Sequence, residues 1–126
     1  MKYASLILLS LMWAAPSFAQ HSHGSEKGPN GGQMEDVAGI DAELVTSGNK
    51  VTINVFDPKN SKPVATKGYS GAVLIVNGAA RETVTLVASG ENSLQGEAKT
   101  AIAPGATVTL TIKTAEGKSG QAKYKK

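Results

Sequence analysis

The sequence predicts an all-β protein, an antiparallel immunoglobulin-like β-sandwich of about seven short strands behind a flexible N-terminal arm. Two observations predict it: apolar and polar residues alternate in short runs, and turn residues interrupt these runs about every ten residues. No stretch shows a sustained helical period with capping residues. With 126 residues, the chain has the length of one domain. Because aromatic residues make up only 5% of the chain, Val, Ile, Leu and Ala must form the core.

The first three predicted strands are separated by two breaks. Apolar residues occupy every second position in the first two, and a continuous apolar run forms the third. We expect this third strand to be central and covered on both faces. The breaks are Ser47-Gly48-Asn49 and Asp57–Asn60, and residues 61–70 are irregular around Pro63. The three strands are predicted at residues 40–45, 51–56 and 72–76.

The remaining strands follow the strongest hairpin signal in the chain, Asn77-Gly78, since both residue types tolerate positive φ. Breaks are predicted at residues 89–92 and 103–106, and Glu116-Gly117 predicts a last hairpin. In the final strand Ala122 and Tyr124 share one face. These strands are predicted at residues 83–87, 93–98, 107–113 and 119–124.

The first nineteen residues have the pattern of a secretory signal peptide. Lys2 supplies a positive start, an apolar run follows from Leu6 to Ala15, and Ser17-Phe18-Ala19 places small residues at a cleavage site. The run is too short for a permanent membrane span, and no cysteine follows it for a lipid anchor. We therefore expect cleavage after residue 19, export to the periplasm and no transmembrane anchor afterwards. The alternative is an uncleaved N-terminal anchor.

The stretch 20–33 is predicted to be a flexible arm, followed by the β-domain at residues 34–126. Glycine and polar residues dominate the arm, so ordering it would cost entropy with little apolar burial to offset that cost. Both histidines of the chain, His21 and His23, lie in this arm. The domain therefore contains no histidine, and the chain contains no cysteine.

Composition argues against catalysis and against nucleic-acid binding. Without a histidine or cysteine in the domain, no Ser-His-Asp or Cys-His arrangement can form there. Strand alternation places Asp41 and Glu43 on one face, and we expect them to belong to a solvated surface rather than to an acid–base pair. The formal charge of +3 is mild and lacks the dense basic striping of a nucleic-acid binder. We expect a non-enzymatic protein.

His21 and His23 are the leading metal-ligand candidates. Neutral imidazole binds copper and zinc well, but two imidazoles are too few for a closed zinc site. If cleavage exposes the amine of Gln20, this amine, an amide nitrogen and the His21 imidazole can chelate Cu(II), unless Gln20 cyclises. Alternatively Glu26, or the cluster of Met34 and Glu35 with Asp36, supplies further ligands; the Met34 thioether favours Cu(I), and the carboxylates favour zinc. The predicted metal ligands are His21, His23, Met34, Glu35 and Glu26.

A glycine-rich motif and four further segments carry a resemblance to a known family. They are Lys27-Gly28-Pro29-Asn30-Gly31-Gly32, His23-Gly24, Asp41–Val45, Val51–Asp57 and Lys62–Ala65. These segments resemble the N-terminal β-domain of periplasmic adaptor subunits of heavy-metal efflux pumps of the RND type. In that family a His-bearing segment and a Gly-Pro-His-Gly-Gly-like motif precede a small β-domain. Asn30 stands where the family motif commonly has His, and the adaptor's helical hairpin, lipoyl-like and barrel domains have no counterpart here. The resemblance implies a free-standing periplasmic relative of this metal-associated domain, with pump components as partners.

Three functions are therefore open. The first is a periplasmic protein that loosely binds copper or zinc for heavy-metal efflux or homeostasis. The alternative is a secreted structural or protein-interaction module with no metal role, for which an exposed Ala72–Val76 run would mark the interface. A weaker third possibility is envelope association through the C-terminal lysines, Lys118, Lys123, Lys125 and Lys126.

Overall fold

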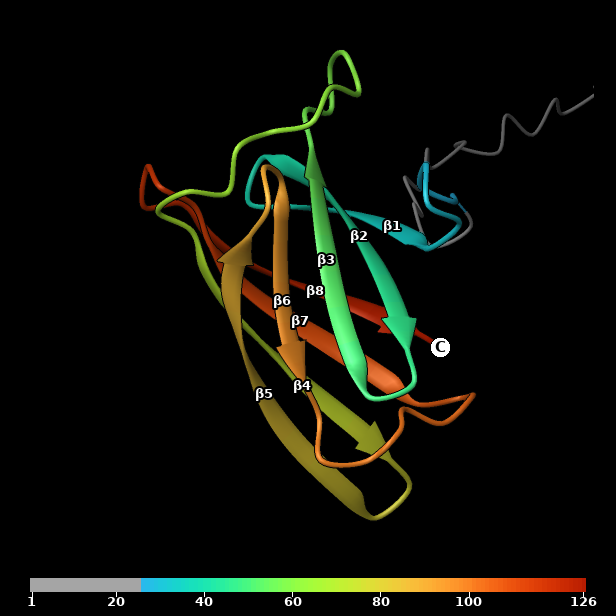
Figure 1. Cartoon of the computed structure of the whole chain (residues 1–126). Coiled ribbons are helices and arrows are strands. Elements are labelled where there is room, and N and C mark those ends of the chain that lie inside the picture. Colours follow the sequence, from blue (N-terminus) through green and yellow to red (C-terminus); the bar gives the residue numbers. More distant parts are fainter. Residues whose placement is uncertain (1–25) are drawn as a thin grey trace, which may run out of the picture.

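Eight antiparallel strands form a nearly closed barrel in the computed structural model (Figure 1). The structure describes residues 26–126, so the predicted signal peptide, His21 and His23 lie outside the described residues. No helix in the described part of the chain has the length and apolar character to cross a membrane. The strands are β1 (Gln33–Val37), β2 (Ile40–Ser47), β3 (Lys50–Phe56), β4 (Ser70–Asn77), β5 (Ala80–Ser89), β6 (Ser93–Glu97), β7 (Thr107–Lys113) and β8 (Ser119–Lys125).

The strands follow the order β1-β2-β3-β6-β5-β4-β7-β8 around the barrel. The long strand β5 joins the two halves, because its first part pairs with β4 and its last residues, Val87–Ser89, pair with β6. Figure 1 shows β5 curving along one edge of the molecule, from its hairpin with β4 toward β6. The ladder is open only between β1 and β8, where side chains make the hydrogen bonds.

The predicted all-β, antiparallel class is confirmed, but the immunoglobulin-like sandwich of seven strands is not what the structure shows. A sandwich needs two separate sheets, whereas β5 here makes the sheet continuous. The additional strand is β1, in which Val37 is the only buried residue. The sequence did not reveal β1 because a strand with one buried apolar residue has no hydrophobic period.

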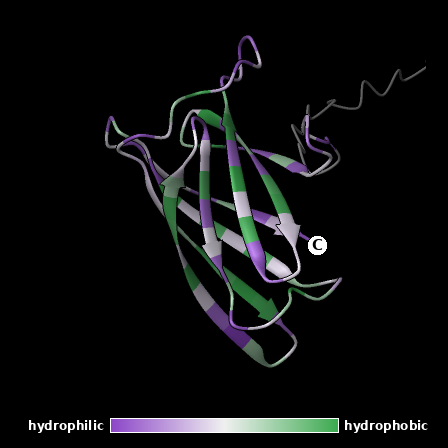
Figure 2. Ribbon diagram, in the orientation of Figure 1, coloured by the Kyte–Doolittle hydropathy of each residue, from purple (hydrophilic) through white to green (hydrophobic). Residues whose placement is uncertain are grey.

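The barrel interior is filled by the alternating apolar residues that the sequence predicts. Figure 2 shows the corresponding hydrophobic and hydrophilic bands along the strands. Tyr124 is 1% exposed and lies among aliphatic side chains of the core. The other large, fully buried apolar side chains are Val51, Ile53, Val55, Val73, Leu94, Val108, Leu110 and Ile112.

The β4–β5 hairpin lies where the sequence predicts it, with a different turn. Asn77 is the last residue of β4 and pairs with Ala80, so Gly78 and Ala79 form the two-residue connection. Gly78 has φ +61°, and Ala79 is not among the residues with positive φ. A type II′ turn requires a positive φ at its first central position, which glycine adopts readily. The connection therefore has the features of a type II′ turn, whose backbone twist matches that of the flanking strands.

Strand β4 is central but is covered on one face only. Val73 and Ile75 point into the barrel and are buried, whereas Ala72, Leu74 and Val76 face outward and are half-buried. The expectation that both faces of this run are covered is therefore wrong. A barrel has a single interior, and in the described residues no second layer lies over the outside of β4.

Candidate functional site

Residues 26–34 form a tight turn on the outside of the barrel. Lys27 pairs with Gln33 in an antiparallel bridge, and the backbone N–H of Gly28 donates to the Gly32 carbonyl at 2.7 Å. The N–H of Met34 donates to the Glu26 carbonyl at 3.0 Å. Composition predicts a flexible arm over 20–33, whereas residues 26–33 of that stretch are hydrogen-bonded; residues 20–25 lie outside the described residues.

The turn is attached to the barrel through the carboxylate of Glu43 in β2. This side chain is fully buried, and both of its oxygens accept hydrogen bonds from the turn. The backbone N–H of Asn30 donates at 2.8 Å, its side-chain amide at 2.8 Å, and the backbone N–H of Gly32 at 3.0 Å. Asn54 of β3 donates a longer bond of 3.5 Å. These hydrogen bonds offset the hydration that the Glu43 side chain loses when the turn covers it.

The solvated surface expected around Asp41 and Glu43 is wrong for Glu43. The two side chains do share the outer face of β2, as the alternation predicts, but the turn covers Glu43. The spacing of residues within a strand predicts on which face of the sheet a side chain lies. It does not predict which other segment covers that face. The sequence signal that could have identified this docking is the glycine pattern of Gly28-Pro29-Asn30-Gly31-Gly32.

Two of these glycines are required by close contact. A Cβ on Gly32 would collide with the carbonyl oxygen of Leu44, and a Cβ on Gly28 would collide with the Glu43 side chain. Gly31 has φ +80° and open space around it, so its requirement is conformational. The glycine-rich motif therefore lets the turn lie directly on β2.

A hollow of about 380 Å³ lies beside this turn. Glu26 and Met34, two of the ligands predicted from sequence, line it together with Asp41. Met34 lies directly opposite Glu43 in the β1–β2 ladder and so faces outward. The remaining lining residues are Lys27, Gly28, Pro29, Phe56 and Ser61.

Glu35 lies on the opposite face of β1 from Met34. Its carboxylate accepts a 2.7 Å hydrogen bond from the Gln33 side-chain amide at the gap between β1 and β8. Burial, followed by the charges of Glu35 and Asp41, raises the pKa of the Tyr124 phenol above its usual value of 10. Glu35 is thus separated from the hollow that Glu26 and Met34 share.

The described residues do not form a complete metal site by themselves. Within residues 26–126, no group of three or more His, Cys, Asp or Glu side chains is arranged to hold a metal ion. Any metal site near the hollow would therefore need donors of another kind or donors from outside the described residues. His21 and His23 are the candidates in sequence, and the structure leaves both untested.

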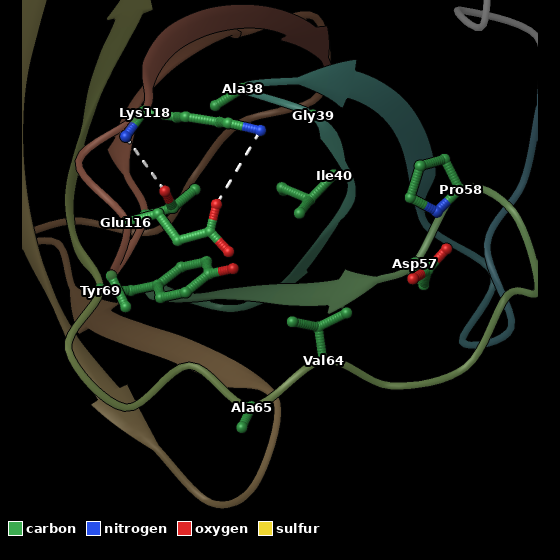
Figure 3. Close-up of a pocket in the computed structure, with 12 residues that line it drawn as sticks. Ala38, Gly39, Ile40, Asp57, Pro58, Val64, Ala65, Tyr69, Glu116 and Lys118 are labelled. Atoms are coloured by element: carbon green, nitrogen blue, oxygen red, sulfur yellow. Dashed lines mark hydrogen bonds and ion pairs between the residues drawn. The ribbon is translucent and has the colours of Figure 1, made fainter.

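A second hollow, of about 350 Å³, opens at one end of the barrel (Figure 3). Figure 3 shows Tyr69, Glu116 and Lys118 together at one side of it, with Val64 and Ile40 nearby. The Lys118 ammonium lies 3.9 Å from the Glu116 carboxylate, and both side chains are largely exposed, so this pair contributes little stability. Burial and, to a smaller extent, Glu116 raise the pKa of the Tyr69 phenol. The hollow offers apolar contact and an ion pair, but its lining contains no histidine or cysteine.

Comparison with known proteins gives no relative. No family model matches the chain, and no curated protein or solved structure matches it. The resemblance to efflux-pump adaptors therefore rests on the residues quoted above. Function must be argued from the turn, its hollow and the sequence that precedes them.

Proposed function

We propose that this chain is a periplasmic, non-enzymatic protein that binds copper or zinc and serves heavy-metal efflux or homeostasis. The observation that carries the proposal is the docked turn, which holds Glu26 beside Met34 at the point where the described chain begins. Only Gly24 and Ser25 separate the histidine pair from Glu26 in the sequence. The resemblance to efflux-pump adaptor domains supports the same function and makes pump components the proposed partners.

Chain length links the histidines to the hollow. Only three residue steps separate His23 from Glu26, and a fully extended chain advances at most about 3.6 Å per residue, so the two Cα atoms lie within about 11 Å. The backbone hydrogen bond from Met34 to Glu26 holds the start of the turn next to β1, the strand that carries the Met34 thioether. Chain length therefore allows the His23 imidazole to reach Glu26 and Met34, whereas the Cα atom of His21, five residue steps from Glu26, has a limit of about 18 Å.

The donor set suits a metal that is bound loosely and passed on. Imidazole is a ligand for both copper and zinc, a thioether favours Cu(I), and a carboxylate favours Zn(II). In this proposal the ligands come from the segment before the turn and from strand β1. Such an open site exchanges ligands more readily than a closed site of four protein ligands. In this proposal His21 and His23 provide the main affinity, while Met34 and Glu26 select between the metals.

The test is metal titration of the purified protein by calorimetry, with Cu(I), Cu(II) and Zn(II) each used alone. The double variant His21→Ala/His23→Ala is expected to lose binding of every metal. Met34→Leu should weaken Cu(I) about tenfold or more while leaving Zn(II) unchanged, and Glu26→Gln should do the reverse, since each removes a donor matched to one metal.

The matched control is Glu35→Gln, which removes a carboxylate one residue from Met34 but on the other face of β1. Its metal affinities should equal those of the unmodified protein. Unchanged Cu(II) and Zn(II) affinities in the histidine double variant would refute the proposal, and the interaction-module alternative would then stand.

A further inference from the structure

The outward face of β5, β4, β7 and β8 carries positive charge only. The antiparallel register aligns its residues in rows that run across the four strands. One row joins Arg81, Val76, Thr107 and Lys125, and the next joins Thr83, Leu74, Thr109 and Lys123. We call this surface the cationic face; its outward residues are Ser70, Ala72, Leu74, Val76, Arg81, Thr83, Thr85, Val87, Thr107, Thr109, Thr111, Lys113, Ser119, Gln121, Lys123 and Lys125.

None of these described positions holds an aspartate or glutamate. The charged side chains are Arg81, Lys113, Lys123 and Lys125, and all four are exposed. Glu116, in the turn after Lys113, is paired with Lys118. The C-terminal lysines Lys123 and Lys125 are therefore not on a loose tail, because strand β8 fixes them on this face.

The other half of the barrel has the opposite charge. The outward positions of β1, β2, β3 and β6 include four carboxylates, and Lys50 is their one cation among these described strand positions. The four are Asp36, Asp41, Glu43 and Glu97. The molecule is thus electrically polarised across the barrel, although its overall formal charge is only +3.

Between the cations, the cationic face carries hydroxyl groups and a shallow apolar centre. Threonines of β5 and β7 flank the half-buried side chains of Ala72, Leu74 and Val76 on β4. A hollow of about 360 Å³ lies beside Lys113 and is lined by the hydroxyl-bearing residues Ser70, Thr111 and Ser119, together with Gly71, Ala72 and Ile112. An ammonium beside several hydroxyl donors is a suitable environment for a phosphate group.

We propose that the cationic face docks on an anionic phospholipid surface. The four cations are distributed over a wide surface that has no carboxylate at its outward positions. Such a distribution matches the many phosphate groups of a lipid surface better than it matches one small anionic ligand. A second copy of this chain is the other occupant with complementary charge, but its acidic half is poorly suited, since Glu43 is buried under the turn. The exposed carboxylates of that half, Asp36 and Glu97, belong to β1 and β6, which β2 and β3 separate.

The experiment is co-sedimentation with phosphatidylcholine vesicles, with and without phosphatidylglycerol. Each cation near an anionic surface is worth about fivefold in partitioning, so Lys123→Gln/Lys125→Gln should weaken binding to the anionic vesicles about 30-fold. Binding of the unmodified protein should also fall as salt is raised, because salt screens these charges. Equal binding to both kinds of vesicle would refute the proposal, as would no binding to the anionic ones.

The matched control is Lys50→Gln/Lys59→Gln, which removes the same charge from exposed positions off the cationic face. It should weaken binding less than threefold; a loss equal to that of Lys123→Gln/Lys125→Gln would show that only net charge matters and refute the proposal. All variants have the same N-terminal sequence. Any contribution of the apolar Leu6–Ala15 run to vesicle binding is therefore the same in each and cancels when the variants are compared. Sedimentation velocity without vesicles completes the test: self-association that Lys123→Gln/Lys125→Gln abolishes would reassign the face to a second copy.

Discussion

At the scale of single residues, Glu43 is a buried carboxylate whose described hydrogen-bond partners are all neutral. Its oxygens accept hydrogen bonds from two backbone amides and from the side-chain amides of Asn30 and Asn54. Ser93 extends this network by donating to Asn54 at 2.6 Å. Amides held in a turn need little reorganisation to meet a carboxyl group, which is how this side chain can be buried without a lysine or arginine beside it.

We predict that Glu43→Gln destabilises the barrel by about 2–3 kcal/mol, measured by urea unfolding. A glutamine presents an NH₂ group where one carboxylate oxygen accepted hydrogen bonds, so it leaves buried turn donors unsatisfied, and hydrogen bonds to charged groups are worth about 1.5–3 kcal/mol. Glu97→Gln is the control, because it makes the same change at an exposed position of the same half of the barrel. Its effect should stay within about 0.5 kcal/mol. Equal effects of the two substitutions would show that the buried network contributes nothing specific.

At the scale of elements, the turn at residues 27–32 is an added layer over the outside of β2. It stays there because Gly28 and Gly32 let its backbone touch the strand, while Asn30 supplies two donors to Glu43. Asn30 thus helps to attach the turn, and the proposed metal ligands lie before and after it in the sequence.

We predict that Gly32→Ala costs clearly more stability than Gly31→Ala. A methyl group on Gly32 would collide with the Leu44 carbonyl oxygen, so the turn must move away from Glu43 and break its hydrogen bonds. Gly31→Ala meets no atom and costs only the strain of a positive φ, about 1–2 kcal/mol. Thermal unfolding measures the stability of the two variants. Hydrogen exchange of the Asn30 backbone amide should become faster in Gly32→Ala and not in Gly31→Ala. The opposite ranking would mean that the turn does not rest on β2.

At the scale of the whole molecule, side chains join the barrel where its backbone ladder is open. The Gln33 amide of β1 accepts from the Lys125 N–H at 3.0 Å and donates to the Lys123 carbonyl at 3.4 Å. The Tyr124 hydroxyl of β8 donates to the Ala42 carbonyl of β2 at 2.8 Å. These bonds tie the last strand of the barrel to its first two.

Tyr124 should make the barrel sensitive to alkaline pH. Its pKa is raised in the folded state, chiefly by burial, so its contribution to stability is complete below about pH 10 and is lost as pH rises through the folded value. We predict that Tyr124→Phe costs about 1 kcal/mol at pH 7, for the lost hydrogen bond. At pH 11 that cost should vanish or reverse, because the unmodified protein alone loses about 1.4 kcal/mol per pH unit from this group. Urea unfolding of both proteins at the two pH values is the measurement; a cost independent of pH would contradict it.

Much of this fold could be predicted because local rules act within each strand. The alternation of Val51, Ile53 and Val55 and that of Val108, Leu110 and Ile112 identified buried faces correctly, since side chains alternate in any strand. Gly78 marked a hairpin because few other residues adopt its positive φ. The resulting prediction of an all-β, antiparallel protein is confirmed. Glu26 and Met34, which the sequence offered as alternative metal ligands, line one hollow in the structure, and their role as ligands stays a prediction.

The sequence by itself determined seven of the eight strands, the apolar side of those whose residues alternate, and that both histidines precede the barrel. Only the tertiary structure decided that the sheet closes, that Glu43 is buried, that Glu35 faces away from Met34's hollow, and that the charged residues at the outward positions of β5, β4, β7 and β8 are all cations. The physical reason is that alternation assigns a residue to a face, whereas its environment depends on strand order and on which distant segment covers it. Strand order joins residues as far apart as Arg81 and Lys125 in one row, and no local pattern contains that information.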